Sequence, residues 1–244
     1  MDQIKSAIVI IPTIGSDVLD KTLTSLENQT YPDVTVLIVV DGPEFKDKAD
    51  IIINKHPTLN KQVVYLQENV GANGFYGQRV YAAFSHLVNK DYLFFLDQDN
   101  WYEPNHIESM IHTIESTGCQ WAYSLRNICS PDGEYILQDN CESLGKWSAW
   151  TNTNMVDTNM VDTNCYCIPK AIAVDIARFW HSGWGEDRVI FKILNENFQN
   201  YECSGKYTIN YRLGGNEGSV TKEFFERGNN VHIEKYLNGY PWVK

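Results

Sequence analysis

Tyr92-Leu93-Phe94-Phe95-Leu96-Asp97-Gln98-Asp99 is the stretch of sequence that decides the expected fold. An unbroken run of apolar residues of this length is typical of a strand that is buried on both faces. The run ends abruptly in two carboxylates that are separated by one residue. Because ligands of open α/β sheets bind outside the carboxyl ends of the strands, these carboxylates are expected to lie at a binding site.

The residues before this stretch alternate between short β-rich runs and longer helical patterns, which predicts a sheet built from βαβ crossovers. The expected elements are strands at 7–11, 34–40, 63–66 and 92–96 and helices at 19–26 and 77–87. Ser16 and Asp17 are placed to cap the first of these helices. Asp41 ends the second strand in an Asp-Gly-Pro turn, so the loops are expected to converge on one nucleotide-sized pocket.

The second half of the chain is less regular. The expected elements there are a helix at 103–115, a strand at 121–126 and a helix that begins near Glu186. Residues 154–163 repeat Asn-Met-Val-Asp-Thr in tandem, a period that is too short for a solenoid and is interpreted as a local duplication in a loop or hairpin. We expect a single domain over 1–244, with a nucleotide-binding half at 1–100, an acceptor-binding half at 101–213 and a tail at 214–244 that is a candidate flap.

The composition is that of an ordinary globular protein, with 43% hydrophobic and 21% charged residues in 244. The formal net charge of -11 and the absence of a basic stripe exclude a protein that holds nucleic acid by bulk attraction. Nothing at the N-terminus resembles a signal peptide and no Cys-x-x-Cys pair occurs, so a cytoplasmic setting is expected. No apolar run approaches the ~20 residues that span a bilayer, which leaves at most peripheral membrane contact.

Two pairs of residues are candidates for metal binding. Asp97 and Asp99 offer hard oxygen ligands, which suit Mn²⁺ or Mg²⁺ together with water and phosphate oxygens. The alternative is that this triplet caps a helix or lies in a solvated turn. Cys165 and Cys167 are interpreted as buried thiols, because alternation along a strand would point them to opposite faces.

Several segments, taken in order, resemble the motifs of family 2 glycosyltransferases with the GT-A fold. They are Val9-Ile10-Ile11-Pro12-Thr13, Val39-Val40-Asp41-Gly42, Asn69-Val70-Gly71, Leu96-Asp97-Gln98-Asp99 and Gly185-Glu186-Asp187-Arg188, and the similarity extends over residues 6–195. The resemblance implies a Rossmann-like, three-layer α/β fold with a central, mostly parallel sheet. The Gln-x-x-Arg-Trp motif and membrane helices of processive synthases are absent from the sequence, which favours transfer of one sugar per encounter.

The resemblance also implies an activity. The expected reaction is a metal-dependent, inverting transfer of a sugar from a UDP-, GDP- or dTDP-linked donor to an acceptor hydroxyl. The acceptor would be a saccharide, a glycolipid or a glycoprotein, and the pathway would be glycan or surface-polysaccharide assembly. The cofactor would be Mn²⁺ or Mg²⁺, which stabilises the departing nucleoside diphosphate.

The residues expected to bind the donor nucleotide are Pro12, Thr13, Asp41, Asn69, Gly71, Arg79 and Asp97. The resemblance implies that Asp41 reads an N–H edge of the base, whereas outside the family context it is a simple turn residue. Asn69 and Gly71 precede a helix whose N-terminus favours an anion, which places them near the diphosphate or ribose. Arg79 is expected to reach a phosphate, with a surface ion pair as the alternative.

The residues that bind the acceptor are expected at the start of the helix that begins near Glu186. The resemblance implies that Asp187 is the general base on the acceptor hydroxyl and that Glu186 lies beside it. The alternative for both is that acidic residues simply favour the positive end of a helix. Trp184 is expected to pack against the acceptor sugar ring, although core packing is the default for any tryptophan.

The resemblance makes Asp99 the direct metal ligand, and His232 in the tail is a second candidate ligand whose alternative is an ordinary surface histidine. Two other functions compete with the transferase. A nucleotidyltransferase of related fold would carry a glycine-rich, basic loop after the first strand, which Pro12 to Asp17 do not supply. An inactive carbohydrate-binding scaffold would be expected to lose its carboxylates, whereas this chain keeps Asp41, Asp99 and Asp187.

Overall fold

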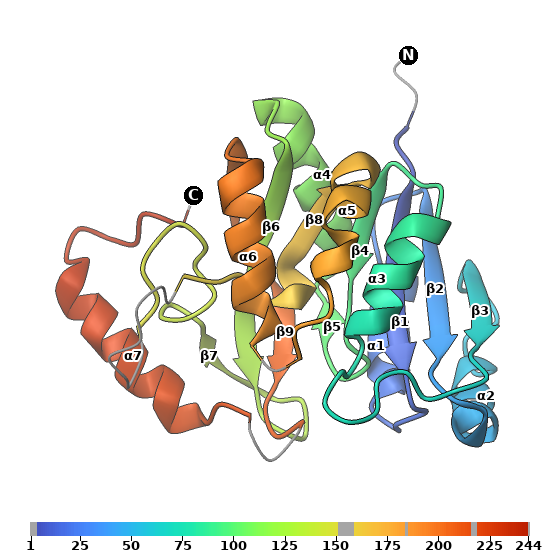
Figure 1. Ribbon diagram of the computed structural model, residues 1–244. Coiled ribbons are helices and arrows are strands. Elements are labelled where there is room, and N and C mark those ends of the chain that lie inside the picture. The colour runs from blue at the N-terminus through green and yellow to red at the C-terminus, as the bar shows by residue number, and fades with distance from the viewer. Residues whose placement is uncertain (1–3, 151–158, 184, 216–218, 244) are drawn as a thin grey trace.

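The computed structural model describes residues 4–150, 159–183, 185–215 and 219–243 (Figure 1). Within these residues the strands form one nine-stranded sheet with the order β3-β2-β1-β4-β8-β6-β9-β5, and β7 pairs with β6. The strands are β1 (Ala7–Thr13), β2 (Val34–Val40), β3 (Lys61–Tyr65), β4 (Tyr92–Phe95), β5 (Trp101–Tyr102), β6 (Trp121–Cys129), β7 (Tyr135–Gln138), β8 (Tyr166–Pro169) and β9 (Tyr201–Arg212).

The sheet is mostly parallel across its first half. β3, β2, β1 and β4 are parallel neighbours, with Ile11 of β1 opposite Ile38 of β2. β8 then runs antiparallel to both β4 and β6, whereas β9 is parallel to β6 and antiparallel to β5. The carboxyl ends of β1, β2, β4 and β6 therefore point to the same edge of the sheet, at the bottom of Figure 1.

Helices cover both faces of the sheet. They are α1 (Leu19–Glu27), α2 (Lys46–Ile53), α3 (Gln78–Leu87), α4 (His106–Thr117), α5 (Lys170–Ile176), α6 (Glu186–Asn197) and α7 (Lys222–Lys235), with short 3₁₀ turns η1 (Pro43–Phe45), η2 (Thr163–Cys165) and η3 (Ala177–Phe179). Figure 1 shows α3, α5 and α6 on one face and α1 and α4 on the other, with α7 beside the sheet next to β7. This three-layer arrangement confirms the predicted α/β fold with a central, mostly parallel sheet.

The burial of the sheet explains why its sequence is so apolar. Every residue of β1 and of β4 is buried, because helices cover the sheet on both faces. In α1, Leu19, Leu23 and Leu26 are buried along one stripe, as their helical spacing predicts. The predicted cap of this helix is wrong, since no side chain caps it and the carbonyl of Ser16 instead accepts the N–H of Leu19 at 3.0 Å.

The sequence patterns located most elements of the first half, with α2 missed, and they missed several elements of the second half. β5, β7, β8, β9, α2, α5 and α7 were not expected from the sequence. β9 is a long strand inserted between β6 and β5, and its polar, half-buried residues hide the alternation that identifies a strand. The tail forms α7, because Thr221 caps a helix whose Phe225 enters a small core with Ile128 and Leu213.

Two further expectations can be placed on the structure. All six cysteine thiols lie within the described residues and are buried, as predicted for Cys165 and Cys167. Of the tandem repeat, the second copy is described from Asn159 onward and leads into η2, whereas 151–158 lie outside the described residues. Among the described helices, none combines the length and apolarity that crossing a bilayer requires.

Candidate active site

A cavity of about 580 Å³ opens at the carboxyl ends of β1, β2 and β4, a size that suits a nucleotide-sugar. Its wall also includes the start of α6 and the ends of β6 and β9. The sequence-predicted residues that line it are Pro12, Thr13, Asp41, Asn69, Gly71, Asp97, Asp99, Glu186 and Asp187. The fold therefore brings donor-side and acceptor-side candidates from distant parts of the chain to one cavity.

Asp41 anchors the neighbouring loop. One carboxylate oxygen of Asp41 accepts the N–H of Val70 at 2.8 Å, and the other accepts the N–H of Gly71 at 2.8 Å. Burial raises the pKa of Asp41, and these two hydrogen bonds oppose the rise. A Cβ on Gly71 would lie 2.1 Å from the carbonyl oxygen of Tyr76, so only glycine fits this turn. Asp41 thus shapes the wall of the cavity in addition to any contact with a base.

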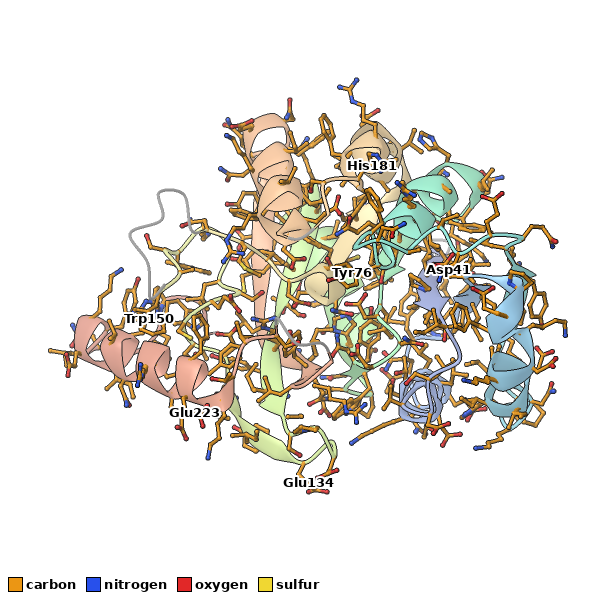
Figure 2. The ribbon with its side chains drawn as sticks, turned by 60° about the horizontal axis from the view of Figure 1, so that its bottom comes forward. Asp41, Tyr76, Glu134, Trp150, His181 and Glu223 are labelled. Atoms are coloured by element: carbon orange, nitrogen blue, oxygen red, sulfur yellow. The ribbon has the colours of Figure 1, made fainter. Side chains whose placement is uncertain are left out.

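The loop that Asp41 anchors presents Tyr76, a residue that the sequence analysis did not single out. Tyr76 lines the cavity, is 53% exposed and has a φ of 46°, which is unusual for a residue other than glycine. Tyr76 and Asp41 lie on the end of the sheet that comes forward in Figure 2. Phe45 lines the same cavity, whereas the loop of Pro12, Thr13 and Ile14 offers no aromatic side chain. The glycine-rich setting of Tyr76 was the available sequence signal.

Thr13 links the first and fourth strands at the floor of the site. Its hydroxyl donates to Oε1 of Gln98 at 2.7 Å and accepts the N–H of Gly15 at 3.0 Å. The backbone N–H of Ile14 also donates to Gln98, at 3.1 Å. These bonds hold the loop after β1 against the loop that carries the acidic pair.

Asp97 is held from two sides at the end of β4. The hydroxyl of Tyr81 donates to one of its oxygens at 2.8 Å, and the side-chain amide of Asn164 donates to the other at 3.0 Å. Asn164 also accepts the backbone N–H of Asp97 at 2.7 Å. Burial and the neighbouring charge of Asp99 raise the pKa of Asp97 to about 7.

Asp99 lines the cavity next to Arg212 and Gly215. Burial raises its pKa, and the charge of Arg212 opposes that rise. Among the described residues, no cluster of three or more histidine, cysteine or acidic side chains could cage a metal. The Asp97–Asp99 pair still fits Mg²⁺ or Mn²⁺, because these hard cations bind through one or two carboxylates and take their other ligands from phosphate and water.

Asp187 lies at the start of α6 and is turned toward the loop that precedes β8. Its carboxylate accepts the backbone N–H of Thr163 at 2.9 Å and the hydroxyl of the same residue. Burial, followed by the neighbouring charge of Asp162, raises the pKa of Asp187 to about 7. A carboxylate with a pKa near neutrality is suited to accept a proton from a hydroxyl at physiological pH.

Glu186 is only 4% exposed and also lines the cavity. One of its oxygens accepts the N–H of Ser182 at 3.2 Å, while Oε2 is buried and has no hydrogen-bond partner. Burial raises the pKa of Glu186 to about 7. A buried carboxyl oxygen without a partner is available to contact a bound hydroxyl, and the acceptor-binding role of Glu186 stays a prediction.

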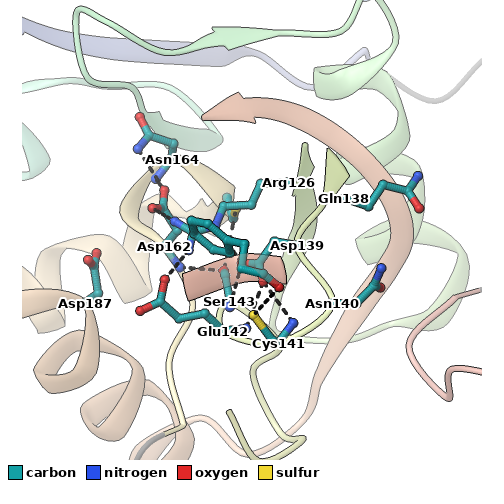
Figure 3. Close-up of polar contacts among 12 residues, drawn as sticks. Arg126, Gln138, Asp139, Asn140, Cys141, Glu142, Ser143, Asp162, Asn164 and Asp187 are labelled. Carbon is teal, nitrogen blue, oxygen red and sulfur yellow. Dashed lines mark hydrogen bonds and ion pairs between the residues drawn. The ribbon is translucent and has the colours of Figure 1, made fainter. Parts of the chain in front are cut away.

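A buried ionic cluster supports the acceptor side and was missed by the sequence analysis. Figure 3 shows Arg126 of β6 surrounded by Asp139, Glu142 and Asp162. Nε of Arg126 lies 2.8 Å from Asp139, and its two Nη atoms pair with Glu142 and Asp162. Arg126, Glu142 and Asp162 reach the cavity wall. Arginine inside an apolar strand was the signal for this cluster, because a buried guanidinium requires acidic partners.

Two of the predicted residues that the structure describes, Arg79 and His232, do not line the cavity. Arg79 donates to the carbonyl of Val70 at 3.2 Å and lies over the ring of Phe75, and it is not among the residues that line the cavity. Its observed contacts support the loop instead of a phosphate. Trp184 lies outside the described residues.

The expected metal-binding role of His232 is corrected by the structure. His232 is 3% exposed within α7, with Nδ1 2.7 Å from the carbonyl oxygen of Asn140, and it does not line the cavity. Its ring packs near Tyr236 and Trp242. This buried position was not predicted, because the helix that turns His232 inward was itself not predicted.

Comparison with known proteins places the chain in a family. The model of the family described as "Glycosyl transferase family 2" matches residues 8–171, which is more than half of the chain. The chain belongs to glycosyl transferase family 2. This agrees with the resemblance drawn from its motifs and classes the domain with the glycosyltransferases.

Two proteins of similar sequence have names that class them with the glycosyltransferases. The chain is 32% identical over 92 residues to the protein named glycosyltransferase EpsH of Bacillus subtilis (strain 168), covering 37% of this chain and 25% of that protein. It is 26% identical over 108 residues to glycosyltransferase GlyA of Streptococcus pneumoniae serotype 4, covering 43% of this chain and 14% of that protein. The chain thus spans a quarter or less of the length of these two relatives.

A solved structure confirms the GT-A architecture. The structure of S. aureus TarS 1-349 in complex with UDP-GlcNAc superposes with a TM-score of 0.66 at 18% sequence identity. The match covers 96% of this chain and 67% of that chain. The complex of the same TarS fragment with UDP gives a TM-score of 0.64. At this identity the similarity demonstrates the fold.

Proposed function

We propose that this domain transfers one glycosyl group from a nucleoside-diphosphate sugar to an acceptor hydroxyl, with inversion at the anomeric carbon. The observation that carries the proposal is the single cavity in which Asp97 and Asp99 of the β4 end meet Asp187 of α6. One end of the cavity offers hard carboxylate ligands, and the other offers Asp187, a carboxylate with a pKa near 7 that Thr163 holds in place. An inverting displacement requires these two parts and no covalent intermediate.

Each residue of the cavity has its own role in the proposed reaction. Asp187 takes the proton of the acceptor hydroxyl as that oxygen attacks the anomeric carbon, and the hydrogen bonds from Thr163 keep its carboxylate oriented. Glu186 contacts the acceptor, and Asp41 holds the loop that borders the nucleotide. A divalent cation bound by Asp99, with Asp97, would neutralise the charge that develops on the departing diphosphate.

The donor base is proposed to be uracil. The TarS structures hold UDP and UDP-GlcNAc, which makes UDP-sugars the first donors to test, with GDP- and dTDP-linked sugars as alternatives. The acceptor is proposed to be a saccharide or a glycoconjugate in surface-polysaccharide assembly, as the membership of glycosyl transferase family 2 leads us to expect. A cytoplasmic setting with peripheral membrane contact at most remains a prediction, supported by the buried cysteine thiols.

Titration calorimetry with UDP, GDP and dTDP, each with and without Mn²⁺, tests the donor site. We expect one nucleotide to bind only in the presence of Mn²⁺, and we expect Asp99→Ala to weaken that binding by about tenfold or more, which is about 1.4 kcal/mol. Removal of the metal with a chelator should abolish the signal. Asp132→Ala, which alters an exposed aspartate in the β6–β7 turn, is the matched control.

The other outcomes are informative. Binding that ignores both Mn²⁺ and Asp99→Ala would contradict the metal site. Absence of binding with all three nucleotides would contradict the transferase and would favour the inactive carbohydrate-binding scaffold.

Tyr76→Ala tests the nucleotide end of the cavity. Because Tyr76 is the exposed aromatic of the loop that Asp41 anchors, we expect its ring to stack on the donor base. Stacking of a base on an aromatic ring contributes about 1–3 kcal/mol, so the dissociation constant for the preferred nucleotide should rise by about 5- to 150-fold. Tyr135→Ala, which removes a 62% exposed tyrosine of β7, should leave the constant unchanged.

A further inference from the structure

The tripeptide Asp162-Thr163-Asn164 contacts both ends of the catalytic cavity. Asn164 pairs with Asp97 through two hydrogen bonds, one to its carboxylate at 3.0 Å and one from its backbone N–H at 2.7 Å. Because one amide group contacts both the backbone and the side chain of Asp97, it fixes the direction in which that carboxylate points. Asn164 and Asp97 are 67 residues apart in the sequence.

The adjacent residue makes the corresponding contact on the acceptor side. The backbone N–H and the hydroxyl of Thr163 both donate to the same oxygen, Oδ1, of Asp187. The second oxygen, Oδ2, therefore remains the one that can take a proton from an acceptor hydroxyl. The charged and titratable groups around Asp187 are Asp97, Asp162, Arg126 and Tyr166.

Asp162 fixes the tripeptide to the interior of the protein. One of its oxygens accepts the N–H and the side-chain amide of Asn164, at 2.9 and 2.8 Å, and the other pairs with Arg126. Its own N–H donates to the hydroxyl of Ser143 at 2.8 Å. Asp162 is buried, and Figure 3 shows it between Arg126 and Asn164. The tripeptide is thus held by a rigid, ionic core on one side while it holds two functional carboxylates on the other.

We infer that Asp162-Thr163-Asn164 is the element that sets the position of the base carboxylate of Asp187 relative to the donor-side carboxylate of Asp97. Thr163 and Asn164 are positioning residues, since each acts through a carboxylate that contacts substrate. The assignment rests on the proposed function. It has one specific consequence: Thr163 affects proton transfer to Asp187, and Asn164 affects binding of the donor through Asp97.

The Thr163 half is tested by the pH dependence of kcat/KM for sugar transfer in Thr163→Val and Thr163→Ser. The hydroxyl stabilises the ionised form of Asp187, so its loss should raise the pKa of that carboxyl. The acid limb of the pH profile, the range over which kcat/KM rises with pH, should then move to higher pH by about one unit. Thr163→Val keeps the backbone bond to Asp187 and nearly the same volume, which should preserve the fold. Thr163→Ser restores the hydroxyl and should return the limb to its wild-type position, with nucleotide affinity unchanged in both variants.

The Asn164 half is tested by nucleotide titration of Asn164→Ala in the presence of Mn²⁺. We expect the dissociation constant to rise about tenfold, because Asp97 loses the contact that orients it, while the acid limb of kcat/KM stays in place. Tyr81→Phe removes the hydroxyl that contacts the other oxygen of Asp97 and keeps the ring. It shows whether the orientation of Asp97 matters for nucleotide binding. Asn164→Ser removes the same amide as Asn164→Ala and replaces that variant should it fail to fold in a thermal melt.

The opposite pattern would overturn the assignment. If the acid limb does not move in Thr163→Val, or if nucleotide affinity survives the loss of the Asn164 amide in Asn164→Ala or Asn164→Ser, the tripeptide has only a structural role. The proposed transferase then still stands. A wild-type protein that binds no nucleotide and transfers no sugar overturns the proposed function, and the assignment falls with it.

Discussion

Asp187→Asn is expected to lower kcat for sugar transfer by about 10²- to 10⁴-fold, the range typical of a lost general base. The amide cannot accept the proton of the acceptor hydroxyl, but it can still accept the N–H and hydroxyl of Thr163. The geometry of the cavity and the affinity for nucleotide should therefore persist. Steady-state kinetics and titration calorimetry on the same protein separate these two effects.

The pH profile of the wild-type enzyme carries an independent signature of the same group. Asp187 has a pKa of about 7, so its ionised, base-competent form predominates above that pH. We expect kcat/KM to rise about tenfold per pH unit below pH 7 and to level off above it. In Asp187→Asn the contribution of Asp187 should disappear, so that any slope that remains below pH 7 belongs to Asp97 and Glu186, whose pKa values are also about 7.

Asp175→Asn is the matched control for this experiment, because Asp175 is an exposed aspartate of α5 that does not line the cavity. Its kinetics should be those of the wild type. Activity in Asp187→Asn within a few-fold of the wild type would show that another group takes the proton. Glu186 would be the next residue to test, since it is buried beside the cavity with an unpartnered oxygen.

Arg126→Met is expected to cause the largest loss of stability, about 3–5 kcal/mol of the free energy of unfolding at neutral pH. The substitution preserves much of the side-chain volume but leaves Asp139, Glu142 and Asp162 buried without their cation. Equilibrium unfolding in urea measures the effect. Arg227→Met, at an exposed position of α7, should change the free energy of unfolding by less than about 0.5 kcal/mol.

The loss should depend on pH with a definite sign. Burial would raise the pKa of Asp139, but Arg126 and the N–H groups of Ser143 and Cys141 outweigh it and hold that pKa below its usual value. In the wild type this carboxylate stabilises the fold above its unfolded pKa, near 4, and the contribution is lost as the pH falls through the lower folded value. Without the guanidinium the folded pKa rises, so the variant should lose stability as the pH increases from about 4 to 7.

The difference between the two proteins should thus be smallest in acid and widen toward neutral pH. A loss below about 1 kcal/mol at pH 7 would contradict the view that the three carboxylates are ionised around Arg126.

Local sequence patterns predicted most elements of the first half of the fold, whereas the roles of the candidate site residues came from the resemblance of the motifs to a family. Continuous apolar runs predicted β1, β2 and β4, since a strand covered on both faces must be apolar throughout. The carboxylates Asp41, Asp97 and Asp187 could be placed because each directly follows a strand or opens a helix. Those positions depend on neighbours in the sequence, which a single chain displays.

Only the tertiary structure decided how these residues are held and which others join them. Asn164 reaches Asp97, Thr163 reaches Asp187, and Arg126 gathers acidic partners from separate loops. The same packing turned His232 into the interior beside Asn140 and away from the cavity. Contacts of this kind depend on how the helices and strands pack together. A buried charge pairs with whichever opposite charge lies near it in space, and the distance between two residues in space cannot be deduced from their spacing along the chain.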